Sequence, residues 1–368
     1  MDKLFITFSI LLFLTGCAER IEQPSLEDIG MVGSMGFDVA EDDKIRVTIS
    51  LPLPGQGDNG EIQFTENVTL AHEAIRALSR VSDRDLSVAQ LRTVLFSEEF
   101  AKEVGLKKIT HYLYRNPMVG DTVFIAVVKG KAEDILTKKY KANKSNSEYL
   151  NNLLHPRSST AFHPFTTLHD FTFYKTSETG DPMTPYLEDT IEGLRISKVA
   201  LFDYDKMIKT LDPEEALIAS ALHDDRTLAD MKLNLEGDEE DSFENQIMLN
   251  FVQSKVKITS NGSLEKPFFN IKLQLTANVL EYHGPLQLDQ DSDINNLEER
   301  INKELKSRAE KTIEGFKEAG VDPVLLGEHL RAHISQDEWT KDKWKEALPK
   351  MTYEVDVITE IKNSGTIR

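Results

Sequence analysis

The fold is decided by two apolar runs, Leu91-Arg92-Thr93-Val94-Leu95-Phe96 and Val123-Phe124-Ile125-Ala126-Val127-Val128. Both are short and rich in β-branched and aromatic residues, a composition that predicts strands. The second run contains almost no polar residue, which is typical of a strand buried on both of its faces. We therefore expect the second strand to lie inside the protein.

Each of these strands leads into a predicted helix. Ser97 stands at an N-cap position, and Glu98 and Glu99 fall in the first helical turn, where carboxylates favour the positive helix end. Gly105 is expected to close this short helix, because glycine readily adopts the left-handed conformation at a helix end. A second helix is predicted from Lys131 to Lys139. The order strand, helix, strand, helix predicts a βαβ unit with parallel strands and a right-handed crossover.

A hairpin is predicted upstream of this unit. The stretch 29–39 resembles a strand, 40–43 a turn, and the alternating stretch 45–51 a partner strand. Farther along, four apolar residues at helical spacing predict one helical face: Leu70, Ala74, Leu78 and Val81. Two stretches rich in polar residues, glycine or proline, 143–160 and 176–190, are expected to be loops.

The second half of the chain alternates long strands with helices. A strand is predicted at 196–202, and Asp212 with Pro213 opens a helix that runs to Leu222. Strands are then predicted at 243–251, 255–259 and 268–280, followed by a long helix and a last strand at 353–361. The apolar stripe of the long helix consists of Leu297, Ile301, Leu305, Ala309, Ile313 and Phe316. The fold class is therefore α+β, with two to three domains of mixed, distorted sheets and packed helices.

The N-terminus has the pattern of a bacterial lipobox. An apolar stretch of 11 residues, Leu4 to Leu14, is followed by Thr15-Gly16-Cys17, and Cys17 is the only cysteine. The stretch is too short to cross a bilayer, which takes about 20 residues, but it fits a signal peptide. Residues 1–16 are thus expected to be a lipoprotein signal peptide and Cys17 a lipidation site. The alternative is an ordinary secretory signal with an incidental cysteine.

The remaining chain divides by composition. Residues 17–28 are polar and are expected to form a lipidated tether. The region 29–191 is expected to be an N-terminal α/β region of one or two subdomains, and 192–368 a C-terminal α+β domain, with the boundary near Glu192. A mature chain of this length is too long for one ordinary core. With a single cysteine, no intramolecular disulfide can form.

The net charge of −19 limits the possible partners. Nucleic acid and anionic lipid headgroups should both repel such a surface, so no nucleic-acid partner is expected. Membrane attachment is expected to depend on the lipid or on an integral-membrane partner.

No motif for catalysis or cofactor binding stands out. Gly30, Gly33 and Gly36 have the wrong spacing for a dinucleotide loop and indicate close packing of a strand. Ser34 lacks the preceding glycine of a nucleophile elbow. We expect no cofactor and no enzymatic activity.

Three clusters could bind a metal, and each has a simpler interpretation. His329 and His333 are one helical turn apart, but Leu330 stands where a zincin has glutamate. His155, His163, His169 and Asp170 lie close together within a loop region. Asp289, Asp291 and Asp293 resemble a calcium loop, but Ile294 and Arg300 replace its essential glycine and glutamate. We expect solvated or structural roles and no metal site.

Segments from most of the chain occur in a characteristic order: Gly16-Cys17, 29–33 with Phe37-Asp38, 77–79, 95–106, 115–117, 128–136, 199–202, 266–271, Trp344, 353–361 and Gly365. In this order the sequence resembles the Ger(x)C family, the C subunits of nutrient germinant receptors in spore-forming bacteria. Two features depart from the family pattern. Ala18-Glu19 replace the usual tryptophan and aspartate, and the segment 316–323 lacks the usual glycine-rich turn after the long helix.

The resemblance implies a lipoprotein of α/β-type domains on the outer face of the spore inner membrane. It implies complexes with an A subunit and a multi-spanning B subunit, a role in germination, and no catalytic residues. The alternative function is a solute-binding lipoprotein of a transporter, which would need two lobes around a hinge and a ligand cleft.

Overall fold

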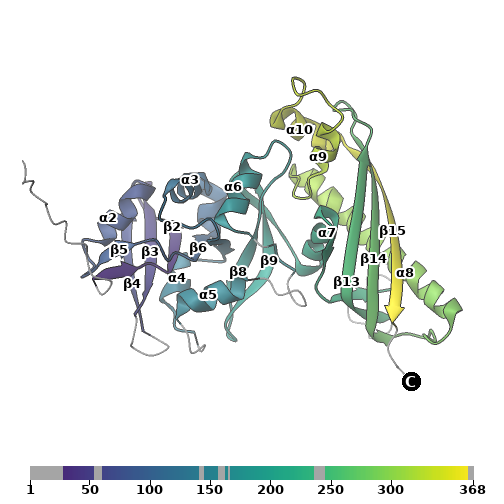
Figure 1. Ribbon diagram of the computed structural model, residues 1–368, viewed down its shortest axis with the longest axis horizontal. Helices are drawn as coiled ribbons and strands as arrows, with labels where there is room; N and C mark the ends of the chain where they lie inside the picture. Colours follow the sequence, from purple (N-terminus) through teal and green to yellow (C-terminus); the bar gives the residue numbers. More distant parts are fainter. Residues whose placement is uncertain are drawn as a thin grey trace, which may run out of the picture.

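The computed structural model describes residues 28–53, 60–140, 145–155, 162–164, 166–235 and 245–363. Cys17, the segment 1–16 and nearly all of the expected tether lie outside the described residues. Two sheets, each with helices packed on it, lie side by side along the molecule (Figure 1). Among the described residues, no helix has both the length and the apolar character needed to span a bilayer.

The first sheet has eight strands in the order β10-β9-β8-β7-β6-β2-β3-β4. Its strands are β2 (Ser34–Val39), β3 (Ile45–Pro52), β4 (Glu61–Val68), β6 (Thr93–Ser97), β7 (Phe124–Val128), β8 (Met183–Asp189), β9 (Leu194–Asp203) and β10 (Lys206–Leu211). A separate short pair, β1 (Ile29–Met31) and β5 (Asp85–Ser87), runs parallel.

The centre of this sheet confirms the predicted βαβ arrangement. Strands β2, β6, β7 and β8 are parallel neighbours, and every residue of β6 and β7 is buried. The Ser97 hydroxyl accepts a hydrogen bond from the Phe100 amide at 3.2 Å, which caps the segment that follows. That segment continues as a π-helix, η2 (Phe100–Val104), and ends at Gly105 with φ of 81°. The hairpin of β2 and β3 is also confirmed.

Helices cover both faces of the first sheet (Figure 1). The face that carries Phe37 and Phe96 is covered by η1 (Ala71–Glu73), α2 (Ala74–Leu78), η2, α3 (Lys107–Arg115) and α6 (Leu168–Thr176). The opposite face, with Leu95 and Ala126, is covered by α4 (Ala132–Thr137) and α5 (Asn146–Leu154).

Three local predictions were wrong. The expected loop 143–160 contains α5, whose N-cap Ser145 accepts a hydrogen bond from the Glu148 amide. The expected loop 176–190 contains strand β8, which tolerates Pro185 because neighbouring strands fix its extended backbone. The expected helix at 70–81 is only α2 with a preceding 3₁₀ turn, and Leu70 and Val81 are exposed.

The second sheet has five strands in the order β11-β13-β14-β15, with β12 paired to β13. They are β11 (Arg226–Thr227), β12 (Met231–Asn234), β13 (Gln246–Ser260), β14 (Phe268–His283) and β15 (Thr352–Asn363). The two strands predicted at 243–251 and 255–259 are one strand, β13. A bulge interrupts its pairing between Asn250 and Gln253, where Phe251 has φ of 49°.

One face of the second sheet packs on α7 (Pro213–His223) and the long helix α8 (Asp291–Ala319). All six residues of the predicted α8 stripe are buried. The N-cap role of Asp212 is confirmed by a hydrogen bond that its carboxylate accepts from the Glu215 amide. Three short elements follow α8: α9 (Leu326–Arg331), α10 (Lys341–Ala347) and η3 (Leu348–Lys350). The α+β class is thereby confirmed.

Glu192, the expected domain boundary, lies between β8 and β9, which are adjacent strands of the first sheet. The chain therefore stays in the same sheet at this point and leaves it only after Leu211. Strand β9 contributes to both cores, because Ala200 and Phe202 pack into the first and Val199 and Leu201 into the second. The division into domains at 191 and 192 stays a prediction.

Candidate functional site

The glycines singled out in the sequence pack the first sheet against its helices. A Cβ atom on Gly36 would lie 2.9 Å from the Cβ of Ala132, and one on Gly33 would lie 2.6 Å from Oγ of Ser147. Strand β2 and the residue before it thus approach α4 and α5 more closely than a side chain at these two positions would allow. Ser34 is fully buried in β2. These positions serve packing, as the sequence indicated.

The histidines of the first half have separate surroundings. His163 is buried, with Nδ1 3.2 Å from the carbonyl oxygen of Pro164, and burial lowers its pKa. His155 lies edge-on to Phe124, and His169 lies beside Tyr114. Asp170 forms the capping box of α6 with Thr167. Each side chain is thus accounted for by a local structural contact.

The other two metal candidates lie in and beside helices α8 and α9. His329 lies in α9 and His333 in the turn after it, and burial lowers the pKa of His329. Asp291 is the first residue of α8, and Asp293 accepts a hydrogen bond from the Gln287 amide at 2.7 Å. In the part of the chain that the structure describes, no three His, Cys, Asp or Glu side chains are grouped to hold a metal ion.

A buried ion-pair network joins the two halves of the chain. Asp181, in the segment before β8, has a side chain only 1% exposed. Its carboxylate lies 3.2 Å from Nζ of Lys341 and 2.6 Å from Nζ of Lys345, both on α10. Lys345 also pairs with Asp203 of β9 at 2.6 Å. Burial lowers the pKa of Lys341, and the charge of Asp181 opposes that shift. We call these four residues the junction network.

A second buried carboxylate, Asp322, lies against the junction network. Its backbone amide donates to Asp181 at 2.8 Å, and the Asp181 amide donates back to its carbonyl at 3.0 Å. The Asp322 carboxylate accepts hydrogen bonds from the amides of Leu326 and Gly327 and from the Trp344 indole. Burial nevertheless raises the pKa of Asp322 to about 6. The turn after α8 is thereby fixed to the first half of the chain.

Aromatic contacts complete this connection between residues 178–204 and residues 320–345, which we call the joint. The ammonium of Lys341 lies 4.4 Å from the ring centre of Tyr204, within the range of a cation–π interaction. The Tyr204 hydroxyl donates to Asp342 at 2.8 Å, and the Trp339 indole donates to the carbonyl of Glu178 at 3.2 Å. Residues from 178 to 204 are thus held by residues from 320 to 345.

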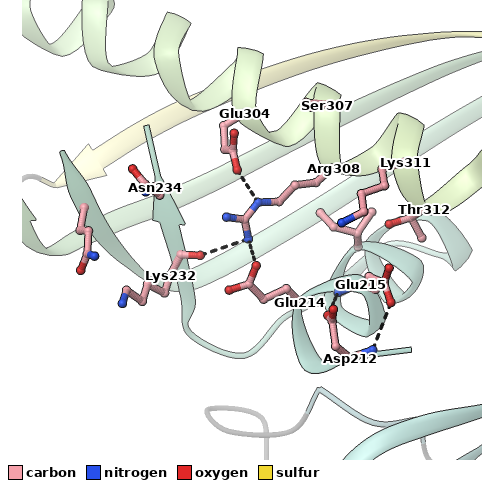
Figure 2. Close-up of a pocket in the computed structure, with 12 residues that line it drawn as sticks. Asp212, Glu214, Glu215, Lys232, Asn234, Glu304, Ser307, Arg308, Lys311 and Thr312 are labelled. Carbon is pink, nitrogen blue, oxygen red and sulfur yellow. Dashed lines mark hydrogen bonds and ion pairs between the residues drawn. The ribbon is translucent and has the colours of Figure 1, made fainter. Parts of the chain in front are cut away.

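A polar cavity of about 260 Å³ lies between α7, α8 and β12, shown in Figure 2. Arg308 of α8 occupies its middle, with Nε 2.6 Å from Glu304 and Nη1 2.5 Å from Glu214 of α7. Nη1 also lies 3.4 Å from the carbonyl of Lys232 in β12. Glu215 contributes to the cap of α7. The guanidinium therefore bridges three elements, which is a structural use of this charge.

A smaller cavity of about 130 Å³ lies at the joint between the halves and contains His223. Nε2 of His223 lies 3.1 Å from the Tyr174 hydroxyl, and Nδ1 of His223 lies 3.4 Å from the Asp224 carboxylate. The Asp224 carboxylate also binds the guanidinium of Arg226. Burial raises the pKa of Tyr174.

Sequence reasoning did not identify the residues of the joint. Asp181 and Lys345 are 164 residues apart. Asp322 belongs to the segment 316–323, which the sequence marked only as a departure from a family pattern, and Trp344, its hydrogen-bond partner, was noted only for its resemblance to that family. The one sequence signal that could have indicated Asp181, Asp322 and Lys345 is that they are charged and lie in stretches without a helical or strand pattern. The predicted lipidation site Cys17 lies outside the described residues, so the structure does not place it.

Comparison with known proteins matches two family models to successive parts of the chain. The model described as "Spore germination protein N-terminal domain" matches residues 22–189. The model described as "Spore germination B3/ GerAC like, C-terminal" matches residues 197–365. The junction network thus connects Asp181, in the first matched part, with α10, in the second.

Curated relatives match over nearly their whole length. The "Spore germination protein GerQC" of Bacillus cereus is 26% identical over 365 residues, covering 99% of both chains. The "Putative spore germination protein YfkR" of Bacillus subtilis (strain 168) is 22% identical over 393 residues, covering 99% of this chain and 97% of that protein. The "Crystal Structure of the GerBC protein" has a similar fold, with a TM-score of 0.57 at 17% identity, covering 89% of this chain and 97% of that one.

Proposed function

Because the chain belongs to the family of GerAC-like spore germination proteins, we propose that it is a lipid-anchored, non-enzymatic subunit of a nutrient germinant receptor. The match of two spore germination models to successive parts of one chain carries this proposal. The proposed partners are an A subunit and a multi-spanning B subunit in the membrane. The proposed location is the outer face of the spore inner membrane.

The proposed anchor is a diacylglyceryl group on the thiol of Cys17. It rests on the sequence of residues 4 to 17, where an apolar run ends in small residues before the only cysteine. Each buried methylene contributes about 0.8 kcal/mol, so two acyl chains give stable attachment where one gives only marginal attachment. The net charge of −19 disfavours contact between most of the protein surface and anionic headgroups. The lipid is therefore the main attachment.

A non-enzymatic role is supported by how the buried charges are used. Asp181, Asp322 and Arg308 each accept or donate several bonds that connect different elements of the fold. Groups held in this way contribute to rigidity. We infer that the two halves act as one rigid body within the complex.

The alternative, a solute-binding lipoprotein, gains no specific support. That function requires two lobes that close over a ligand about a hinge. Here β9 is shared by both cores, and buried ion pairs connect Asp181 to α10. A thermal-shift screen with amino acids, sugars and nucleosides separates the two functions, because a true ligand raises the stability of the folded state. We expect no shift.

The anchor is tested with Cys17→Ala in the full chain, expressed in a spore-forming host. We expect this variant to lose acylation and to be washed from the membrane fraction by molar salt, which screens electrostatic contacts. Thr15→Ser is the matched control, since it keeps a small residue ahead of the cysteine and should behave as wild type. Acylation and membrane retention that persist in Cys17→Ala would exclude this anchor.

The receptor role is tested by affinity purification from detergent-solubilised spore membranes. A tagged full chain should bring down two further membrane proteins, one of them multi-spanning, identified by mass spectrometry. A deletion strain should lose its response to the nutrient of that receptor, and the wild-type gene should restore it. Purification of the chain without membrane partners would contradict the proposal.

A further inference from the structure

Helix α3 exposes an unusually basic and aromatic face. Its buried side chains are Ile109, Thr110 and Leu113. The opposite face presents residues that recur at helical spacing and include no carboxylate: Lys107, Lys108, His111, Tyr114 and Arg115. Just after the helix, Met118 is 55% exposed. A solvated surface would not normally carry this combination of cations with large apolar groups.

Helix α6 extends this face. His169 lies beside Tyr114, with ring centres 6.3 Å apart, and Phe173 follows one turn later on the same side of α6. Phe173 is 57% exposed and Tyr114 is 46% exposed. Figure 1 shows α3 and α6 next to each other on one side of the first sheet. We define the α3–α6 patch as Lys107, Lys108, His111, Tyr114, Arg115, Met118, His169 and Phe173.

The cations of the patch have no carboxylate partner in the described part of the chain. Neither Lys107 nor Lys108 nor Arg115 forms an ion pair there, although many other surface cations do. Several carboxylates border the patch. Asp205 accepts a hydrogen bond from the Lys107 amide, and the carbonyl of Asp121 accepts one from the His169 amide. Asp170, next to His169, is engaged in the capping box of α6, and Glu103 lies in η2 before α3. The patch is therefore a positive area on a protein with a net charge of −19.

We propose that the α3–α6 patch lies on the surface of an anionic lipid membrane, with its cations at the headgroups and Tyr114, Met118 and Phe173 at the interface. Aromatic side chains favour the headgroup level because they are apolar with a polar or polarisable edge. An anionic membrane surface attracts lysine and arginine side chains, and this attraction falls off within about one Debye length of the surface. The patch supplies both contributions on one face.

The membrane, rather than an acidic protein, is the favoured occupant because of the proposed anchor, and in this respect the inference rests on the proposed function. The 11 Cα–Cα steps from Cys17 to Asp28 span at most about 40 Å when extended. The first half of the chain is thus held near the bilayer, where a weak contact acts at high effective concentration. The remaining, acidic surface is repelled by headgroups, so the patch determines which face turns toward the membrane.

The test uses the full chain with Cys17→Ala, so that binding through the patch is measured without acylation. Flotation compares vesicles of phosphatidylcholine with vesicles in which about a third of the lipid is phosphatidylglycerol. The patch variant is Lys108→Gln with Arg115→Gln. The matched control is Lys255→Gln with Lys257→Gln, which removes the same charge from exposed positions of β13 in the second sheet.

We expect phosphatidylglycerol to increase binding, and the patch variant to reduce this gain about 25-fold, at about fivefold for each cation. The control should stay within about twofold of the parent, and molar salt should abolish the gain. Equal binding of the patch and control variants, or binding that does not depend on phosphatidylglycerol, would overturn the proposal. So would a patch variant that binds vesicles normally but no longer copurifies with membrane subunits, since the patch would then be a protein interface. Because every variant in the vesicle measurements carries Cys17→Ala, these comparisons hold whether or not Cys17 is the lipid anchor.

Discussion

Nζ of Lys345 lies 2.6 Å from Oδ2 of Asp181, a carboxylate whose side chain is only 1% exposed. The two residues are 164 apart in the sequence, one on α10 and the other just before β8. An ion pair removed from water in this way is stable only while both partners are present, because each alone would be a buried, uncompensated charge. The pair therefore makes the folding of the two halves interdependent.

Asp181→Asn should lower the free energy of unfolding by about 3–5 kcal/mol, since it leaves Lys341 and Lys345 without their shared counter-charge. Chemical denaturation measures this value. Asp189→Asn is the control, because Asp189 pairs with Lys138 at the surface, where a lost pair costs about 0–1 kcal/mol. If the two variants lose similar amounts of unfolding free energy, the junction network stabilises the fold no more than a surface ion pair does.

The stability of the joint should depend on pH through Asp322. Burial raises the pKa of Asp322 to about 6 in the folded chain, above the value of about 3.9 expected when the chain is unfolded. Between these values the folded state binds more protons than the unfolded state. The contribution of Asp322 is therefore fully present below about pH 4 and is lost as the pH rises through about 6.

Asp322→Asn removes this titration. The variant should be less stable than wild type, and the difference should be larger at pH 4 than at pH 7, by up to about 3 kcal/mol. Unfolding free energies of both proteins at the two pH values give the comparison, in which the other titrating groups cancel. A difference independent of pH would show that Asp322 has the same charge in both states.

The predictable parts of the fold are those set by local pattern. The stripe from Leu297 to Phe316 and the run from Val123 to Val128 are buried, because periodicity reports directly on which side chains face a core. Helix α5 was missed because a partner from elsewhere in the chain stabilises its start. The Glu61 carboxylate of β4 accepts hydrogen bonds from the amides of Asn146 and Ser147.

The joint could not be predicted either, because it too depends on contacts between residues that are distant in the sequence. Strand β8 contains a proline and lies in a stretch with turn residues, so its neighbours β7 and β9 determine its conformation. Asp181 and Lys345 acquire their roles only when that strand is in place. No sequence signal marks two charges that meet across so many residues.

Asp38 of β2 should be important for the position of α4. Its carboxylate accepts hydrogen bonds from the amides of Ala132 at 2.7 Å and Glu133 at 2.9 Å, so a strand residue caps the helix. Asp38→Ala should cost about 2 kcal/mol of stability and should speed amide exchange at these two positions. Asp38→Asn retains one acceptor and should cost less. Unchanged exchange in Asp38→Ala would mean that other contacts hold the helix.

The contact between β2 and α4 should tolerate no added atom at Gly36. A Cβ there would lie 2.9 Å from Cβ of Ala132 and 3.0 Å from Cδ1 of Leu136, and both neighbours are buried. Because Asp38 fixes the start of α4, the helix cannot move away freely. Gly36→Ala should lower the free energy of unfolding by about 1–3 kcal/mol.

Gly120→Ala is the matched control, since the nearest atom to its added Cβ, Oγ1 of Thr122, is 3.8 Å away. It should change stability by about 0.5 kcal/mol or less. In a double-mutant cycle, Ala132→Gly should be less harmful in the Gly36→Ala background than in wild type, because it removes one of the two clashing carbons. Independent effects of the two changes would mean that strand and helix separate under this strain, and that the glycine is not required for their close approach.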